Sequence, residues 1–599
     1  MYSKGDIATS FIDDRKYKHF TLPTGMKCIL ISDPEAELSS VCILNPKGSL
    51  YDPPQYQGLT HFMEHMLFLG SKKYPHERHY REFISNHGGK CNAWTFWNFT
   101  YFHFDIDHEN YEEALDILSE QLTEPLFDFD AARREIWAVN SEHFVNSSSN
   151  VSRYHTLLRD LAHPESAFSK YLLGNLRTLD IVNSKYTDND LENLNKLMDF
   201  DAHDNKRDDA LDKDKLHTLL AVLKKHHEST FSADQMFAVL LSNKPLKDIE
   251  NLAKATVGKI PKRTGQRVVD FSKDPGPVEQ FGKMVRFRPI STWEFVSIFF
   301  FLPPMSTKLT KPIKFINYLV ASSTNLSLSS FLKEQGMIFE IFSYYEHANN
   351  FFSYLELRIT LTKKGHDSHD KVIRVLGAYL FWLKTKFLLK DEDLLTVYKE
   401  WVHEKRIVSY YSSGSGQGLD YCTQIAKNMC MFGADNPEVL FTNKAPSFSA
   451  KPQNFISIDA LNIEEGIQEV GELLKCMDGK RSIGFFCSSE FLYDDPNPKT
   501  KFGKIFTQYI HGVKYTVENV AELFATVFGF DWEGAIDYAK YEEAQKALKE
   551  TPVVEEKMAE KKSQPPVVKS SSKNIPATQQ TTNQFNKAAK KGGVAFDVH

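Results

Sequence analysis

The sequence of 599 residues has few cysteines, and none of them are spaced as a C-x-x-C pair. The seven that it has are scattered along the chain, which argues against a disulfide framework or a thiolate zinc site and favours a reducing compartment. The chain also lacks an excess of positive charge, with a formal net charge of -6 and a pI near 6.4. Because nucleic acids and anionic membranes recruit proteins through a basic field, we expect neither as a partner.

Long apolar runs are missing as well. No segment approaches 18 uninterrupted apolar residues, the length expected of a membrane-spanning helix. The N-terminal residues, from Met1 to Asp14, have neither the apolar core of a secretion signal nor the Arg-rich, acid-poor character of a transit peptide. These absences predict a cytoplasmic protein that does not contact membranes.

The composition that is present is that of a folded protein. The chain is 42% hydrophobic and 25% charged, and it is too long for a single hydrophobic core. We predict a first domain over residues 1–265 with an acidic insertion at about 186–214, and a second domain over 285–515. A Pro- and Gly-containing connection at 245–285 would join them. A helical extension at 516–550 and a disordered tail at 551–599 would follow, because apolar spacing disappears beyond Thr551.

The hydrophobic pattern mixes strands and helices without a strict βαβ rhythm, which predicts an α+β fold. Alternating or continuous apolar runs predict strands, whereas apolar residues at helical spacing predict helices. The predicted strands of the first domain are 26–32, 39–44 and 100–106, and its predicted helices are 59–69, 111–122 and 130–144. In the second domain we predict strands at 296–302 and 354–361.

The acidic insertion allows two interpretations. It is rich in aspartate, and one of its segments starts like a calcium loop at Asp199. Counted from Asp199, however, the glycine that such a loop requires falls on Asp204 and its bidentate glutamate on Ala210. We therefore favour an exposed, solvated insertion over a calcium site.

The motif that indicates chemistry is His61-Phe62-Met63-Glu64-His65. Residues four apart lie on one face of a helix, so both imidazoles can reach a single ion, with Glu64 next to them. This is the H-x-x-E-H pattern of zinc peptidases of the inverted-zincin type. It predicts a zinc-dependent hydrolase, although a motif this short needs support from another segment.

Catalytic zinc usually takes three protein ligands and a water, so the third ligand must come from elsewhere. Glu135 and Glu142 are seven residues apart in the predicted helix 130–144, and they therefore project from the same face two turns apart. One of them can bind the metal while the other orients a ligand. The alternative is that both are surface carboxylates, as most helical glutamates are.

Around these motifs the sequence resembles the insulysin, pitrilysin and nardilysin family of inverted-zincin metallopeptidases. The matching segments are dense from about residue 17 to 180, and the resemblance can be traced to about 515. It is carried by Gly48-Ser49-Leu50, Gly58 to Pro75, Asn92-Ala93, Arg134-Glu135, Asn140 to His143, His163-Pro164, Phe168 to Lys170 and Gly174-Asn175.

The resemblance implies a role for each residue of the two motifs. His61, His65 and Glu142 would bind one Zn²⁺ per chain, and Glu64 would act as general base. Glu135 would be a carboxylate that orients a metal ligand. The chemistry agrees, because zinc acidifies its water and a neighbouring carboxylate can take the proton.

The resemblance also implies how a substrate binds. Asn92 and Ala93 would lie on an edge strand that pairs with an extended, unstructured peptide through main-chain hydrogen bonds. The aromatic residues that follow, Trp94, Phe96, Trp97 and Phe99, fit half-buried strand packing better than a specificity pocket. Each domain would be an α/β roll of the mitochondrial processing peptidase type, with the first catalytic and the second inactive.

The sequence departs from the family in two places. Full-length members have four homologous domains in two halves around a chamber, and the second half supplies an Arg and a Tyr from a segment resembling R-x-x-E-Q-L-G-Y. The nearest segment here, Leu332 to Met337, has neither residue. In addition, Ala321 to Asn325 replaces a Gly-rich segment that helps anchor a substrate's N-terminus. We therefore expect a partner, either a second copy or a separate subunit that resembles the second half.

The resulting prediction is a zinc metalloendopeptidase that cleaves unstructured peptides. The alternative is a non-catalytic or weakly active subunit that serves as a scaffold or binds peptides. A scaffold has no chemical reason to keep two histidines and two carboxylates in register, which favours the peptidase.

Overall fold

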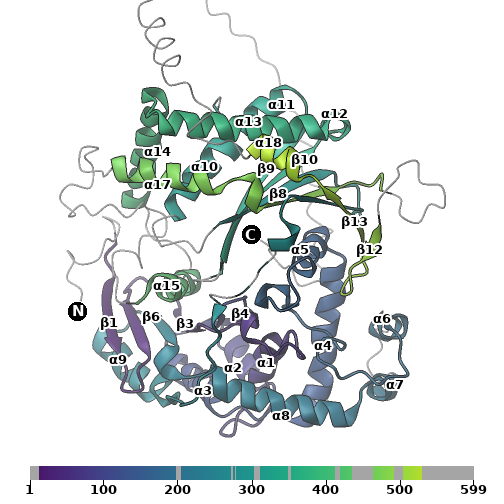
Figure 1. The fold of residues 1–599 in the computed structure, drawn as a ribbon. Helices are drawn as coiled ribbons and strands as arrows, with labels where there is room; N and C mark the ends of the chain where they lie inside the picture. Colours follow the sequence, from purple (N-terminus) through teal and green to yellow (C-terminus); the bar gives the residue numbers. More distant parts are fainter. Residues whose placement is uncertain are drawn as a thin grey trace, which may run out of the picture. The chain divides into compact units, whose positions relative to one another are not determined.

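The computed structural model describes residues 13–196, 204–271, 274, 276, 278–302, 310–324, 326–348, 352–411, 418–434, 463–491 and 504–528. These residues form two mixed sheets with helices on both faces (Figure 1), which confirms the predicted α+β class. The predicted tail at 551–599 lies outside the described residues. Of the predicted extension at 516–550, only the part up to residue 528 is described.

The first sheet has six strands in the order β1-β2-β6-β3-β5-β4. Neighbouring strands are antiparallel except for the parallel pair β2 and β6. The strands are β1 Lys16–Thr21, β2 Lys27–Ser32, β3 Ser39–Asn45, β4 Lys90–Thr95, β5 Thr100–Ile106 and β6 Phe237–Ser242. The order leaves β4 at the edge of the sheet.

The second sheet repeats this arrangement in the order β12-β13-β7-β11-β8-β10-β9. Its parallel pair is β7 and β11, and its edge strand at the corresponding end is β9. The strands are β7 Lys283–Phe287, β8 Phe295–Leu302, β9 Ile338–Ala348, β10 Phe352–Leu361, β11 Ser482–Cys487, β12 Ile505–Thr507 and β13 Lys514–Asn519.

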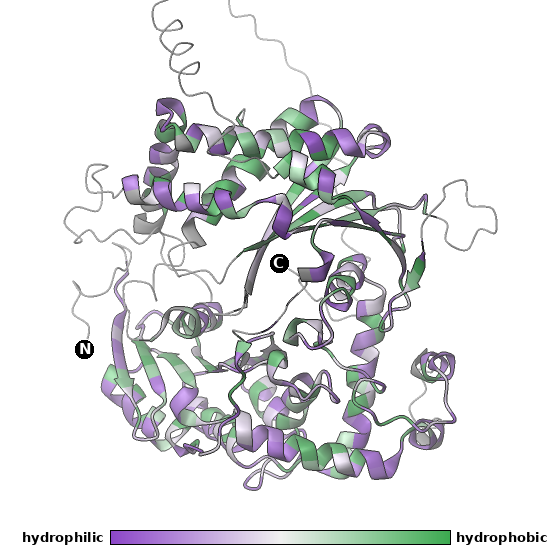
Figure 2. Cartoon of the chain, viewed as in Figure 1, coloured by the Kyte–Doolittle hydropathy of each residue, from purple (hydrophilic) through white to green (hydrophobic). Residues whose placement is uncertain are grey.

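Most helices cover one face of the sheet to which they belong. The longer helices of the first half are α1 Leu59–Leu67, α2 His79–Asn86, α3 Tyr111–Thr123, α4 Phe129–Ser147, α5 Asn150–Asp160, α6 Asp188–Lys196, α7 Asp204–Ala210, α8 Lys213–Thr230 and α9 Leu246–Ala255. Those of the second half are α10 Thr310–Ala321, α11 Leu328–Glu334, α12 Lys363–Asp367, α13 His369–Leu388, α14 Glu392–Tyr411, α15 Gly418–Phe432, α17 Ile463–Cys476 and α18 Ala521–Phe528. Hydrophobic and hydrophilic residues alternate along α8 and α13 (Figure 2), as expected of helices that bury one side.

The other face of each sheet is covered by a helix from the other half of the chain. On the first sheet, Ile425 and Met429 of α15 pack against Cys42, Leu44 and other residues in one buried cluster. On the second sheet, α5 contributes its buried leucines to a cluster with strand residues that include Phe299. Neither sheet is therefore enclosed by its own half alone.

The predicted elements of the first domain agree with the structure to within about three residues at each end. One interpretation was wrong: the segment 245–285 is not simply a connection. It contains α9, which packs on β2, and the start of β7. The prolines were interpreted as marks of a linker, but Pro245 is the N-cap residue of α9 and Pro261 follows this helix. They therefore lie at the two ends of a helix.

The described part of the acidic insertion consists of α6 and α7. Its charged residues are exposed or half-buried, whereas Leu191 and Leu194 of α6 reach the first core. The insertion is thus anchored by leucines, while its carboxylates stay near the surface, where Asp188 pairs with Arg177 and Asp208 with Arg133. Among the described residues, no helix is both long enough and apolar enough to cross a membrane. The domain boundaries themselves remain predictions.

Candidate functional site

Contacts at the N-terminus of helix α1 position the first residues of the site. Gly58 precedes the helix with a φ of 90°, and a Cβ atom there would lie 2.2 Å from the Cα of Gly174. Only glycine fits this left-handed position and this close approach. The buried carboxylate of Asp52 then accepts hydrogen bonds from the backbone N–H groups of Gly58 and Thr60, at 2.8 and 2.9 Å. These contacts fix the first turn of α1, which carries His61.

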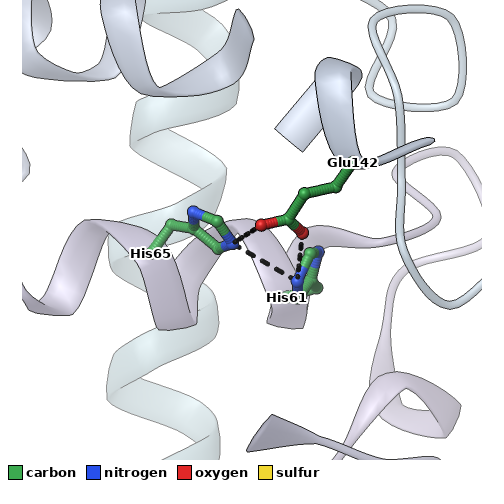
Figure 3. Close-up of side chains that lie close together, drawn as sticks. All are labelled: His61, His65 and Glu142. Atoms are coloured by element: carbon green, nitrogen blue, oxygen red, sulfur yellow. Dashed lines mark hydrogen bonds and ion pairs between the residues drawn. The ribbon is translucent and has the colours of Figure 1, made fainter. Parts of the chain in front are cut away.

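His61, His65 and Glu142 converge from α1 and α4 (Figure 3). Their ligand-type atoms lie within 4.8 Å of one another. The Nε2 atoms of His61 and His65 are 3.3 Å apart, and the two oxygens of Glu142 lie 3.4 Å from His61 Nε2 and 3.6 Å from His65 Nε2. The structure thus brings together the three residues that were predicted as metal ligands.

The Nδ1 atoms of His61 and His65 have hydrogen-bond partners of their own. His61 Nδ1 donates to the carbonyl oxygen of Leu173 at 2.8 Å, and His65 Nδ1 lies 2.7 Å from Glu135 Oε1. With a proton on each Nδ1, both Nε2 lone pairs face the space between the rings. Partners of this kind commonly orient metal-binding histidines. Glu135 and Glu142 therefore use the same face of α4 for two different contacts.

The distances between these groups are close to those around a zinc ion. Ligand atoms bound at 2.0–2.1 Å in a tetrahedron lie about 3.3–3.4 Å from one another. Here the two nitrogens are 3.3 Å apart, and each lies 3.4 or 3.6 Å from a different oxygen of Glu142. Two histidines and one glutamate are also a known ligand set of catalytic zinc. One other group of this type exists among the described residues, formed by His366, Asp367 and Glu490. There the ammonium of Lys363 already contacts both carboxylates, at 2.7 and 2.9 Å.

Glu64 lies between the two histidines in α1 and is buried, with 7% of its surface exposed. Its Oε2 atom accepts a hydrogen bond of 2.6 Å from the hydroxyl of Thr95, at the end of β4. Burial raises the pKa of Glu64 to about 7, although His65 and the Thr95 hydrogen bond act in the opposite direction. A carboxyl group with this pKa can both take up and release a proton near neutral pH.

The two histidines titrate differently. Burial and the neighbouring His65 lower the pKa of His61 to about 4. Burial also disfavours the charged form of His65, but its hydrogen bonds to Glu135 and Glu142 outweigh this effect and raise its pKa to about 10. At neutral pH and without a metal ion, His61 is therefore neutral, whereas His65 carries a second ring proton and a positive charge. A metal ion that binds both Nε2 atoms must displace that proton.

The edge strand that was expected to hold a peptide lies beside Glu64. Strand β4 pairs with β5 and with no other strand among the described residues. Asn92 is exposed in it, and Ala93 points into the core. Of the aromatic residues that follow, Trp97 and Phe99 are buried while 47% of Trp94 is exposed. Packing therefore accounts for two of these rings, and Trp94 stays available to a ligand.

Two contributors to the site were missed in the sequence, namely Thr95 and the Leu173 carbonyl. Thr95 is an ordinary strand residue, and its link to Glu64 exists only because β4 lies across α1. Leu173 acts through its backbone, which no side-chain pattern can indicate. The one available signal was Gly174, because a glycine in a close-packed turn often marks a tight backbone approach.

Comparisons with known proteins agree with this geometry. The insulinase (peptidase family M16) pattern matches residues 27–165, and the peptidase M16 inactive domain pattern matches residues 219–395. The chain is 30% identical over 381 residues to insulin-degrading enzyme of Drosophila melanogaster, a match that covers 63% of this chain and 35% of the relative. It is also 30% identical over 387 residues to protease 3 of Escherichia coli (strain K12), covering 64% and 37%.

The crystal structure of pitrilysin has the same fold, with a TM-score of 0.68 and 24% identity. The match covers 88% of this chain and 50% of the pitrilysin chain. The curated relatives are thus matched over little more than a third of their length. From the two family patterns, the relatives and the fold together, the chain belongs to the insulinase family, peptidase family M16.

Proposed function

We propose that the chain is a zinc-dependent metalloendopeptidase that hydrolyses unstructured peptides. The observation that carries the proposal is the triangle of His61, His65 and Glu142, in which each histidine Nε2 atom lies 3.3 Å from the other and 3.4 or 3.6 Å from one oxygen of Glu142, close to the separations around tetrahedral zinc. These residues would hold one Zn²⁺ per chain. When bound there, zinc supplies Lewis-acid chemistry, since it acidifies water and polarises a carbonyl group.

Other residues of the chain transfer the proton and orient the two histidines. Thr95 donates to Glu64 Oε2 and so leaves Oε1 as the atom that takes a proton from the attacking water. With a pKa of about 7, the same carboxyl group can pass that proton to the departing amine. Leu173 and Glu135 keep the rings of His61 and His65 in their orientations.

Substrate binding is assigned to the edge strand β4. A peptide that adds to this edge forms main-chain hydrogen bonds, which give affinity with little dependence on sequence. In this proposal Asn92 and Ala93 mark the segment against which the peptide lies. A folded substrate has no free extended segment, and we therefore propose unstructured peptides as the substrate class.

We also propose that a second half completes the chamber, supplied by a second copy of the chain or by a separate subunit. Support comes from the share of the curated relatives that the chain matches, about a third of their length. Transition-state assistance from such a half is worth orders of magnitude in rate. The same observation is what favours the alternative, a weakly active or non-catalytic peptide-binding subunit.

Hydrolysis of a quenched-fluorescent peptide library tests the proposal. The full chain should cleave the library only when loaded with zinc, and Glu64→Gln should lose the activity while it keeps the metal. Equal hydrolysis by the wild type and Glu64→Gln would contradict the mechanism. Native mass determination addresses the partner, because a strict monomer with full activity would exclude the need for a second half.

A further inference from the structure

Arg159 lies in the last turn of α5, and its guanidinium group has neither an ion pair nor a hydrogen bond with any residue described in the structure. Its Nε atom is buried without a partner, whereas the residue as a whole is half-buried. The guanidinium carbon lies 3.9 Å from the centre of the Trp97 ring. The group is therefore held by a cation–π contact while its anion-binding capacity remains unused.

Aromatic residues from both halves surround this cation. Trp97 stacks on Phe168 at 4.9 Å, and Phe168 continues to Phe301 of β8 at 6.2 Å. The carboxylate of Glu346, which favours the charged form of Arg159, already accepts a hydrogen bond from the Tyr344 hydroxyl at 2.5 Å. A cation among aromatic rings without a directly bonded anion is costly.

Arg159 keeps its charge despite this environment. Burial lowers its pKa to about 10, and the nearby Tyr354 and Glu346 offset only part of that effect. At neutral pH the guanidinium is therefore protonated, with donors that match a carboxylate in a planar, two-point contact. The guanidinium group of Arg159 thus keeps donors that suit a carboxylate.

The position of Arg159 relates it to the cleavage site. Trp97 belongs to the hairpin that joins β4 to β5, two residues beyond Thr95, which holds Glu64. Two residues of extended chain span at most about 7 Å. A peptide paired with β4 at Glu64 would reach Trp97 and Arg159 on the side of the scissile bond away from Asn92 and Ala93.

We propose that Arg159 binds a carboxylate of the substrate peptide within about two to four residues of the cleaved bond, at ~3.3 Å per residue, and so selects acidic peptides. The inference rests on the proposed function for its peptide path. The carboxylate can be that of an Asp or Glu side chain or that of the peptide's C-terminus. Both offer the same chemistry to the guanidinium group, and the experiment has to separate them.

The test measures binding without hydrolysis. The full chain with Glu64→Gln, loaded with zinc, is titrated with labelled unstructured peptides and followed by fluorescence anisotropy. One peptide pair differs by Glu against Gln near its centre, and a second pair differs by a free against an amidated C-terminus. A charge-assisted contact predicts at least about tenfold tighter binding of one acidic member. The pair that shows the preference identifies the source of the carboxylate.

Substitutions then assign the preference to Arg159. Arg159→Gln should reduce it below about twofold, and Arg159→Met should do the same while it keeps an apolar contact with Trp97. Arg159→Lys should retain part of it, because the charge remains. The matched control is Arg153→Gln, six residues earlier on α5 and therefore on another face, because the Nε atom of Arg153 is likewise buried without a hydrogen-bond partner. This control should leave the preference unchanged.

The outcomes separate this inference from the proposed function. If the chain in which Arg159 is unchanged binds acidic and neutral peptides with equal affinity, the inference is overturned, even if the native chain hydrolyses all of them. A preference that persists in Arg159→Gln and Arg159→Met would overturn it as well. Conversely, a preference that depends on Arg159, found in a chain that hydrolyses no peptide, supports the inference and contradicts the proposed peptidase.

Discussion

The two sheets of the chain share a strand order over five positions, β2-β6-β3-β5-β4 in one and β7-β11-β8-β10-β9 in the other, but among the described residues the cluster of His61, His65 and Glu142 belongs to the first half alone. In each sheet the inner strands run antiparallel except for one parallel pair, and the far edge is reached through the same succession of neighbours. In the first half, α1 lies between β3 and β4 along the chain and presents His61, Glu64 and His65. In the second half, α10 lies between β8 and β9, and its residues Thr310–Ala321 include no histidine, aspartate or glutamate.

The comparison teaches that this fold provides a position for a site but not the site itself. The sheet order fixes where a helix crosses the edge strand, and side chains on two helices decide whether that place holds metal. A family pattern named as an inactive domain overlaps the second half, in agreement with the missing ligands. Function must therefore be argued from the residues of α1 and α4 rather than from the architecture.

The largest expected effect is on zinc content, when the first half loses a metal ligand and so comes to resemble the second half. His61→Ala removes one of three ligands, so bound zinc measured by atomic emission should fall to background and peptidase activity with it. His366→Ala, from the second histidine–carboxylate group, serves as the control and should leave the zinc content unchanged. One zinc per chain retained in His61→Ala would place the metal elsewhere.

Glu64→Gln separates chemistry from metal binding. The variant should keep its zinc, because Glu64 is not in the triangle, while kcat/KM for a quenched peptide falls about 10²–10⁴-fold through loss of the general base. Glu112→Gln, an exposed glutamate in the first turn of α3, is the matched control. Activity within a few-fold of wild type in Glu64→Gln would assign the proton transfer to another group.

The covering helices allow a test of how far the halves depend on each other. Ile425 of α15 is 1% exposed and packs on the first sheet, and Leu158 of α5 is equally buried against the second. Each alanine variant should lower the free energy of unfolding by about 2–5 kcal/mol, measured by urea denaturation. If Ile425→Ala leaves the first half unaffected, the exchange of helices does not stabilise it.

Glu135→Gln should have a smaller effect on the metal centre. The variant loses the charge that holds His65 Nδ1, and outer partners of this kind contribute about 10–100-fold to metal affinity or activity. Competition with a chelator measures the affinity. Glu113→Gln, exposed on α3, controls for the loss of one negative charge, and zinc affinity equal to that of this control would exclude an orienting role for Glu135.

The smallest effect is that of a change of one unit in pH. Burial raises the pKa of Glu64 to about 7, and the group must be deprotonated to act as a base. The rate kcat/KM should therefore be complete above this pH and fall about tenfold per unit below it. An activity that stays constant down to pH 5 would show that Glu64 keeps its ordinary acidity.

Local patterns predicted the first domain well because its elements are amphipathic or continuously apolar. Helices α1, α3 and α4 lay where helical spacing indicated, and the two-turn separation of Glu135 and Glu142 predicted their common face. What depended on tertiary contacts was not predictable. Thr95 reaches Glu64 only across the sheet, and nothing in the sequence of α15 indicates that it crosses to the first half.

The exchange of helices also has a consequence for synthesis on the ribosome. Strand β6 ends at Ser242 and α15 at Phe432, so the face of the first sheet that α15 covers waits for roughly 190 more residues, about 10–40 s at ~5–20 residues per second. During that interval an apolar surface that includes Ile29, Ile31 and Leu44 is not covered by α15. The nascent chain should then be a client of chaperones, and pauses in translation between these two points should favour aggregation.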